Sequence, residues 1–314
     1  MRSPGNFLTT LVRALFALML VTAMASCGGG HRKPVEVENP YASRAQDFIN
    51  NGKMAMQQEQ WQAAEGSFSR ALLAAQLADD TSLVSQSWYN IGVARAAMGL
   101  QLKAKDAYNR AIRLAERHKL DVMHMRARLA LMLLSLRSNM LAADFMLDEL
   151  LSSKHWPADI YLQAARIMQL KKQPEQAKNA YNTVLNFKGK GRTILKMKAE
   201  AHMGLALLAK SAGEIGEAQS HADKTLVLCH RIGAARLTAH ALLLKGQMPG
   251  EPGINDTRRD ELERALDIYS VLKDVRGQKQ SLAHLNRLAK AAGDEQAMKR
   301  IQLRLRTLND KLEQ

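Results

Sequence analysis

Cysteine is the residue type whose position in this sequence points most directly to a chemical role. The chain of 314 residues holds two cysteines, Cys27 and Cys229. Cys229 lies among apolar residues in the stretch KTLVLCHRIG, and we expect a buried thiol there that behaves as a small hydrophobic side chain. Cys27 lies in the stretch MASCGGG, after two small residues and before three glycines, which makes it the candidate for covalent modification.

No other part of the sequence forms a catalytic pattern. The motifs G-x-S-x-G, H-E-x-x-H, G-x4-G-K-[ST] and C-x-x-C do not occur. His221 and His230 fall on roughly one helix face, but a metal site needs three or four converging ligands. The stretch KGKGR at residues 188–192 has the composition of a phosphate-binding loop, but we interpret it as a solvated loop between helices. We therefore predict that the protein is not an enzyme and holds no metal or cofactor.

The residues before Cys27 have the composition of an export signal. Arg2 and Arg13 supply positive charge without any acidic residue, and residues 14–23 form the apolar run ALFALMLVTA. This run is shorter than the roughly 20 residues that a membrane-spanning helix needs, but it fits the apolar part of a secretory signal. We therefore predict a signal peptide over residues 1–26.

The end of this segment, Met24-Ala25-Ser26-Cys27, resembles the lipobox of bacterial lipoproteins, although that family prefers Leu where this chain has Met24. The resemblance implies that Cys27 becomes the mature N-terminus and carries covalent diacylglycerol and an N-linked acyl chain such as palmitate. Several acyl chains together anchor a protein stably. Gly28 follows Cys27 where an Asp would resemble an inner-membrane retention signal, so the implied location is the outer membrane, facing the periplasm of a Gram-negative bacterium. The alternative is an ordinary signal peptide with Cys27 as a bystander.

The segment after Cys27 reads as a linker, and the charge of the whole chain is basic. Residues 27–41 are rich in Gly, Pro and charges without helical periodicity, which predicts a flexible tether. Removal of Arg2 and Arg13 lowers the net charge from +15 to +13. An exported protein does not meet genomic DNA, so we expect no nucleic-acid partner. A basic surface there would face anionic lipid, cell-wall polymer or an acidic protein.

From residue 42 onward the pattern is helical and repeats itself. Residues 48–72 align with residues 88–112 without a gap, at an offset of 40 positions. The aligned positions are small, aromatic or aliphatic in both copies: Phe48 with Trp88, Gly52 with Gly92, Ala64 with Ala104, Phe68 with Tyr108, Ala71 with Ala111 and Leu72 with Ile112. Small residues let two antiparallel helices approach closely, and the aromatic side chain fills the space beside them. The alternative is a generic helical bundle with an Ala-Leu stripe.

This pattern resembles the tetratricopeptide repeat, or TPR, with two departures: Arg95 stands where Tyr is usual, and Asn51 where Leu is usual. The resemblance implies an all-α, right-handed superhelical solenoid of about six to seven helical hairpins over residues 42–314. The repeats are strongest over 44–118. A degenerate repeat carries a loop at 246–257, and residues 276–314 form capping helices.

In a TPR solenoid the first helix of each repeat lines a concave groove. The resemblance therefore implies a partner-binding groove formed by Gln46, Ile49, Asn50, Lys53, Gln86, Tyr89, Asn90, Arg128 and Arg166. Asn90 occupies the position of the Asn in the carboxylate clamp of chaperone-type TPR domains. The paired Lys and Arg of that clamp are missing from the third copy.

The sequence thus predicts a membrane-anchored TPR scaffold that binds another envelope protein. It is similar to TPR lipoproteins that assist envelope assembly or secretion, such as pilotins and adaptors of cell-wall hydrolases. The alternative is a binder of anionic envelope polymer or lipid through the basic surface. The partner, the pathway, the oligomeric state and the repeat count stay open at this point.

Overall fold

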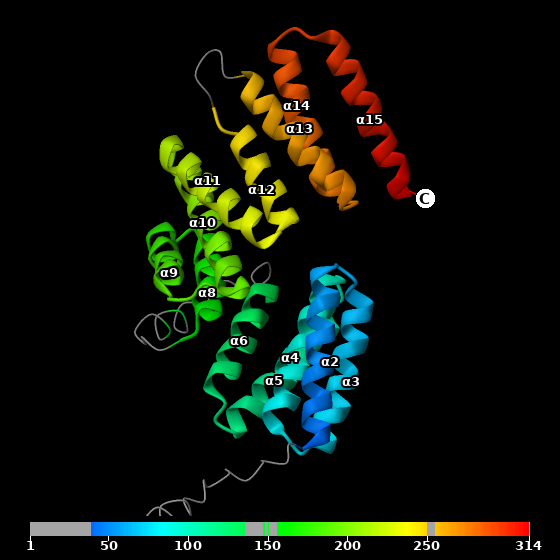
Figure 1. The fold of residues 1–314 in the computed structure, drawn as a ribbon, viewed down its shortest axis with the longest axis vertical. Helices are drawn as coiled ribbons and strands as arrows, with labels where there is room; N and C mark the ends of the chain where they lie inside the picture. The colour runs from blue at the N-terminus through cyan, green and yellow to red at the C-terminus, as the bar shows by residue number, and fades with distance from the viewer. Residues whose placement is uncertain (1–38, 136–146, 148–149, 151–155, 250–254, 314) are drawn as a thin grey trace, which may run out of the picture.

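A computed structural model describes residues 39–135, 147, 150, 156–249 and 255–313. Thirteen α-helices and no strands make up this part of the chain (Figure 1). In the N-terminal half the helices are α2 (Pro40–Gln57), α3 (Trp61–Leu77), α4 (Thr81–Ala97), α5 (Gln101–Arg117), α6 (Asp121–Ser135) and α8 (Ala158–Leu170). In the C-terminal half they are α9 (Pro174–Asn186), α10 (Arg192–Ala212), α11 (Ile215–Ile232), α12 (Ala235–Gly246), α13 (Asn255–Val271), α14 (Val275–Ala291) and α15 (Glu295–Glu313).

Consecutive helices pack as hairpins that stack into a solenoid. Hairpins are formed by the helix pairs α2/α3, α4/α5, α8/α9, α10/α11, α12/α13 and α14/α15. Helix α6 occupies the third position of the stack, between the hairpins α4/α5 and α8/α9. Each first helix also packs against the first helix of the next hairpin. We call α2, α4, α6, α8, α10, α12 and α14 the A helices, and their hairpin partners the B helices. The predicted all-α helical-repeat solenoid is confirmed.

Local sequence signals begin and end these helices. The side chains of Asn39, Asp80 and Asp274 cap α2, α4 and α14 by accepting hydrogen bonds from backbone N–H groups in the first turn. Gly213 ends α10 with a φ of 81°, a left-handed conformation in which glycine carries no steric penalty. The Asn39 cap means that α2 begins at Pro40, so the last two residues of the predicted tether are helical.

Two other predicted segments can be compared with the described residues. Helix α12 includes Gly246 and α13 begins at Asn255, so residues 255–257 of the predicted loop 246–257 are helical. The predicted capping region 276–314 consists of α14 and α15. The signal segment 1–26, Cys27 and most of the tether lie outside the described residues. Among the helices that the structure describes, none is long and apolar enough to span a bilayer.

The core of the first two hairpins is built on close contact between a glycine and an aromatic ring. A Cβ atom added to Gly52 would lie 2.3 Å from Phe68 Cε1, and one added to Gly92 would lie 2.5 Å from Tyr108 Cε1. Beside these rings Ala64, Ala104 and Ala111 are all 0% exposed. These residues therefore lie in close packing between the two helices of each hairpin, while Trp88 is only partly buried and carries Arg110 over its ring at 4.8 Å.

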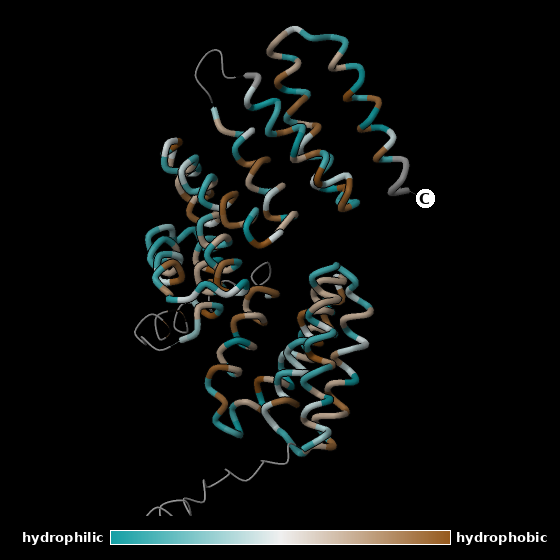
Figure 2. Tube along the Cα trace, in the orientation of Figure 1, coloured by the Kyte–Doolittle hydropathy of each residue, from teal (hydrophilic) through white to brown (hydrophobic). Residues whose placement is uncertain are grey.

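Farther along the chain, the same kind of glycine–aromatic contact joins two neighbouring hairpins instead of the two helices of one hairpin. A Cβ atom on Gly204 of α10 would lie 2.2 Å from Tyr181 Cζ, and Tyr181 belongs to the preceding hairpin through α9. Gly277 of α14 lies in the same way against Tyr269 of α13. Figure 2 shows hydrophobic and hydrophilic residues alternating along each helix, as expected when one face of every helix packs on its neighbours.

Candidate functional site

The A helices curve toward one side of the solenoid. The Tyr89 side chain on α4 lies close to Gln163 on α8, although α6 lies between these two helices in the stack. A side-chain contact that passes over an intervening helix requires the row of A helices to bend toward that side. This face is therefore concave over α4, α6 and α8, and we call it the A-helix groove. Burial raises the pKa of the Tyr89 phenol, so the hydroxyl stays protonated at neutral pH.

Arginine–carboxylate pairs join successive A helices. Arg126 of α6 donates two hydrogen bonds to Asp159 of α8, at 2.6 and 3.0 Å. Arg166 of α8 donates to Glu200 of α10 at 3.0 Å. In the C-terminal part, Arg236 of α12 pairs with Asp274, which caps α14. Each pair is partly exposed and contributes little stability alone, about 0–1 kcal/mol. The bidentate geometry of the Arg126–Asp159 pair also fixes how α6 and α8 sit relative to each other.

Six of the predicted groove residues lie where a partner could reach them, and one of them is Arg166 on α8, whose side chain is 45% exposed. Gln46, Asn50 and Lys53 are exposed along one stripe of α2, and Gln46 Nε2 donates to Asn50 Oδ1 at 3.1 Å. Gln86 on α4 and Arg128 on α6 are half-buried. Amide groups on these helices supply both donors and acceptors to an incoming backbone.

The remaining predicted groove residues are used within the chain itself. Ile49 is 0% exposed, so its prediction as a groove contact is wrong. Together with Ala45 and Gly52 it forms the stripe of α2 that faces the core, which lies about 100° from the Asn50 stripe. Asn90 is 8% exposed, and its Nδ2 atom has no hydrogen-bond partner in the part of the chain that the structure describes. Tyr89 holds the groove together through Gln163, as the exposed Arg166 does through Glu200.

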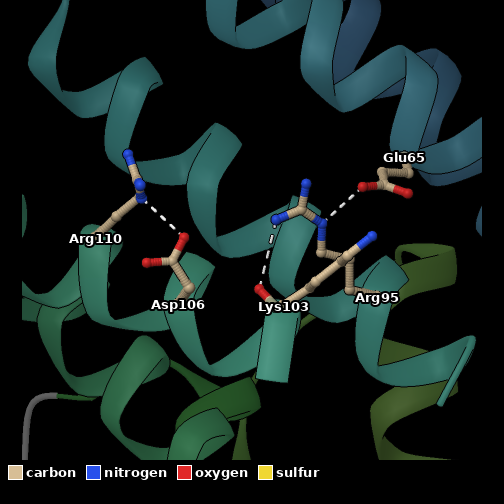
Figure 3. Close-up of polar contacts among 5 residues, drawn as sticks. All are labelled: Glu65, Arg95, Lys103, Asp106 and Arg110. Carbon is tan, nitrogen blue, oxygen red and sulfur yellow. Dashed lines mark hydrogen bonds and ion pairs between the residues drawn. The ribbon is translucent and has the colours of Figure 1, made fainter. Parts of the chain in front are cut away.

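Arg95, the departure from the TPR pattern, has a clear structural role on the side of the B helices (Figure 3). Its Nε donates to Glu65 of α3 at 2.6 Å, and its Nη1 donates to the backbone oxygen of Lys103 on α5 at 3.4 Å. One guanidinium thus links both hairpins. The nearby pair of Arg110 and Asp106, at 2.9 Å, lies within α5 alone.

The other candidates for chemistry behave as packing or solvated groups. Cys229 is 0% exposed, and burial raises the pKa of its thiol to about 11, as expected for an inert core residue. The loop between α9 and α10 consists of residues 187–191, so residue 192 of the predicted loop 188–192 is the first residue of α10. His221 lies against His202, with Nδ1 atoms 3.0 Å apart, rather than with His230. Within the described ranges no three His, Cys, Asp or Glu side chains form a metal-binding group.

His202 of this pair lines a hollow of about 830 Å³ between α9, α10 and α11. Lys198, His202, Lys224 and Val227 are among its lining residues. Burial, together with the neighbouring His221, Lys224 and Lys198, lowers the pKa of His202 from 6.5 to about 4. The pair therefore stays neutral at physiological pH.

The comparisons with known proteins agree with this geometry. A family model described as a tetratricopeptide repeat matches residues 85–118, which cover most of α4 and all of α5. No curated protein sequence matches the chain.

Three solved structures are similar in fold. The apo form of the quorum sensor NprR from B. thuringiensis has a TM-score of 0.61 at 15% identity, covering 85% of this chain and 77% of that one. The Rap conjugation gene regulator of plasmid pLS20, in complex with a Phr peptide, has a TM-score of 0.58 at 13% identity, covering 96% and 86%. The apo form of RapI has a TM-score of 0.54 at 10% identity, covering 86% and 98%. At these identities the likeness concerns the fold alone. The chain is therefore an all-α helical-repeat solenoid that contains a tetratricopeptide repeat at residues 85–118.

Proposed function

We propose that this protein is a non-enzymatic scaffold that is lipid-anchored at the outer membrane and binds a protein partner of the bacterial envelope through its A-helix groove. The observation that carries the binding role is the concave face itself, marked by the Tyr89–Gln163 contact across α6. The similar Rap regulator with its Phr peptide is a solenoid of this fold with a bound peptide, which supports a protein or peptide ligand here.

The exposed side chains of the groove favour an extended or helical segment of a protein as the ligand. Gln46 and Asn50 present amide groups, and Lys53 presents a cation beside them. Amides pair with the N–H and C=O groups of a peptide backbone, whereas a polymer of uniform negative charge would need a row of cations. The stripe on α2 contains one cation among three residues.

Site-specific photocrosslinking in the bacterial envelope tests this function. A benzophenone amino acid replaces Asn50 in the groove, and a control carries it at Leu102, which is 85% exposed on the B helix α5. We expect one discrete crosslinked protein from position 50 and none from position 102. Equal products from both positions, or no product from the groove, would contradict the proposal.

The basic charge of the chain supports the alternative function, binding of an anionic envelope polymer or lipid. Electrostatic binding of this kind weakens steeply as salt screens the charges. Association with purified cell wall or lipopolysaccharide that falls steeply between low and high salt, together with no groove crosslink, would select the alternative.

A further inference from the structure

One ion pair joins two hairpins that are far apart in the stack. Arg236, in the first turn of α12, pairs with Glu59 in the turn between α2 and α3. In Figure 1 the lower end of α12 faces the upper end of the α2/α3 hairpin, where this turn lies. The same guanidinium also contacts Asp274, so Arg236 bridges the first hairpin and the C-terminal part of the solenoid.

The two carboxylates hold Arg236 differently. The Asp274 side chain is 14% exposed and accepts a hydrogen bond from the Gly277 N–H at 2.9 Å, which fixes it at the start of α14. The Glu59 side chain is 38% exposed and lies in a turn. The pair of Arg236 with Asp274 therefore stays formed within the C-terminal part, and the pair of Arg236 with Glu59 is the one that can break.

The rest of this junction is thin. Among the described helices, neither α2 nor α3 forms a packed helix interface with α12 or α13. In a solenoid each repeat packs only on its neighbours, so small rotations between repeats add up along the chain. A contact between hairpins many repeats apart therefore restrains the accumulated motion of all the repeats between them.

We propose that the Glu59–Arg236 ion pair is an electrostatic latch. When the pair is formed, the first hairpin is held against the start of α12 and the solenoid is closed. When the pair is broken, the two parts separate and the A-helix groove widens. Because both side chains are about one-third exposed, salt screens their attraction and opens the latch.

Distance measurements by double electron–electron resonance test the latch in the full chain. Spin labels are attached to cysteines that replace Gln62 and Arg231, both exposed, in a background with Cys27→Ser and Cys229→Ala. At low salt we expect one main distance population, and at high salt a second, longer one. Glu59→Gln should give the longer population already at low salt. Loss of one exposed ion pair changes the ratio of the two populations by about fivefold at most.

The matched control is Asp260→Asn, which removes the same charge and breaks the exposed pair of Asp260 with Arg264 inside α13. It should leave the distances unchanged. Circular dichroism melting confirms that both variants are folded, and the salt titration of the parent chain needs no variant. The latch is excluded if Glu59→Gln keeps the parent distribution, if salt leaves the parent distances unchanged, or if Asp260→Asn has the same effect as Glu59→Gln.

Discussion

The side chains of Tyr89 on α4 and Gln163 on α8 meet across the intervening helix α6. The contact couples the second hairpin directly to the fourth, although hairpins of a solenoid ordinarily touch only their neighbours. Arg126 and Asp159 lie beside it and join α6 to α8. The curvature of the groove is therefore held by polar side chains on the same face that we propose for ligand binding.

Removal of the Tyr89 hydroxyl should loosen this part of the groove. We expect Tyr89→Phe to lower the free energy of unfolding by about 0.5–1.5 kcal/mol, because the polar contact of the hydroxyl with Gln163 is lost while the ring packing stays. Urea unfolding followed by circular dichroism measures the change. Tyr41→Phe is the control, since Tyr41 is 41% exposed, and it should have no measurable effect. Equal stability of Tyr89→Phe and the parent chain would show that the contact contributes nothing.

The contact between Gly92 and Tyr108 predicts opposite outcomes for two glycine substitutions. Gly92→Ala places a methyl group 2.5 Å from the Tyr108 ring, so we expect a loss of about 1–3 kcal/mol from overpacking. Gly66→Ala, inside α3, meets nothing within 4 Å and should raise the stability by about 0.5–1 kcal/mol. Thermal melting of both variants checks the pair. A neutral Gly92→Ala would mean that the two helices separate easily at this point.

The sequence predicts the first two hairpins well because their contacts are local and repeated. Gly52 with Phe68 and Gly92 with Tyr108 pair inside one hairpin at the same spacing, so two aligned copies reveal them. Gly204 packs on Tyr181 of the preceding hairpin, and no single-repeat motif encodes a contact of that kind. The error at Ile49 has a simpler origin: neighbouring positions on a helix differ by about 100° in direction, so a shift of one residue moves a side chain from groove to core.

Contacts that depend on the curvature of the whole stack could not be predicted from the sequence. Tyr89 meets Gln163, and Glu59 meets Arg236, only because many small angles between hairpins add up. Each of these residues looks like an ordinary polar position in its own helix or turn. Their pairing becomes visible only in the assembled solenoid.

The lipid anchor stays a prediction, and Cys27 offers a direct test. We expect metabolic labelling with an alkyne fatty acid to mark the protein and Cys27→Ser to lose both the label and the membrane association. Cys229→Ser is the matched control, because the buried thiol should carry no lipid. Membrane association of Cys27→Ser at the parent level would contradict lipid anchoring.

His202 makes the stability of the chain depend on pH in a defined direction. Burial, with the charges of Lys224 and Lys198, lowers its pKa from 6.5 to about 4, so the folded chain resists protonation where the unfolded chain takes up a proton. Stability is therefore fully present above about pH 6.5 and falls as the pH drops toward 4. Because the side chain is partly exposed, solvent screens part of this effect, and we expect a loss of about 1 kcal/mol between pH 7.5 and 5.

The variant His202→Gln should remove the loss of stability between pH 7.5 and 5 that comes from protonation of His202. Urea unfolding of the parent chain and of the variant at pH 7.5, 6 and 5 gives the difference in pH dependence. The contributions of the carboxylates and of the other histidines largely cancel in this difference. His118→Gln, at an exposed position, should keep the parent slope. A parent slope in His202→Gln would show that the contact with His221 does not suppress protonation, and that His202 is charged in the folded chain at pH 5.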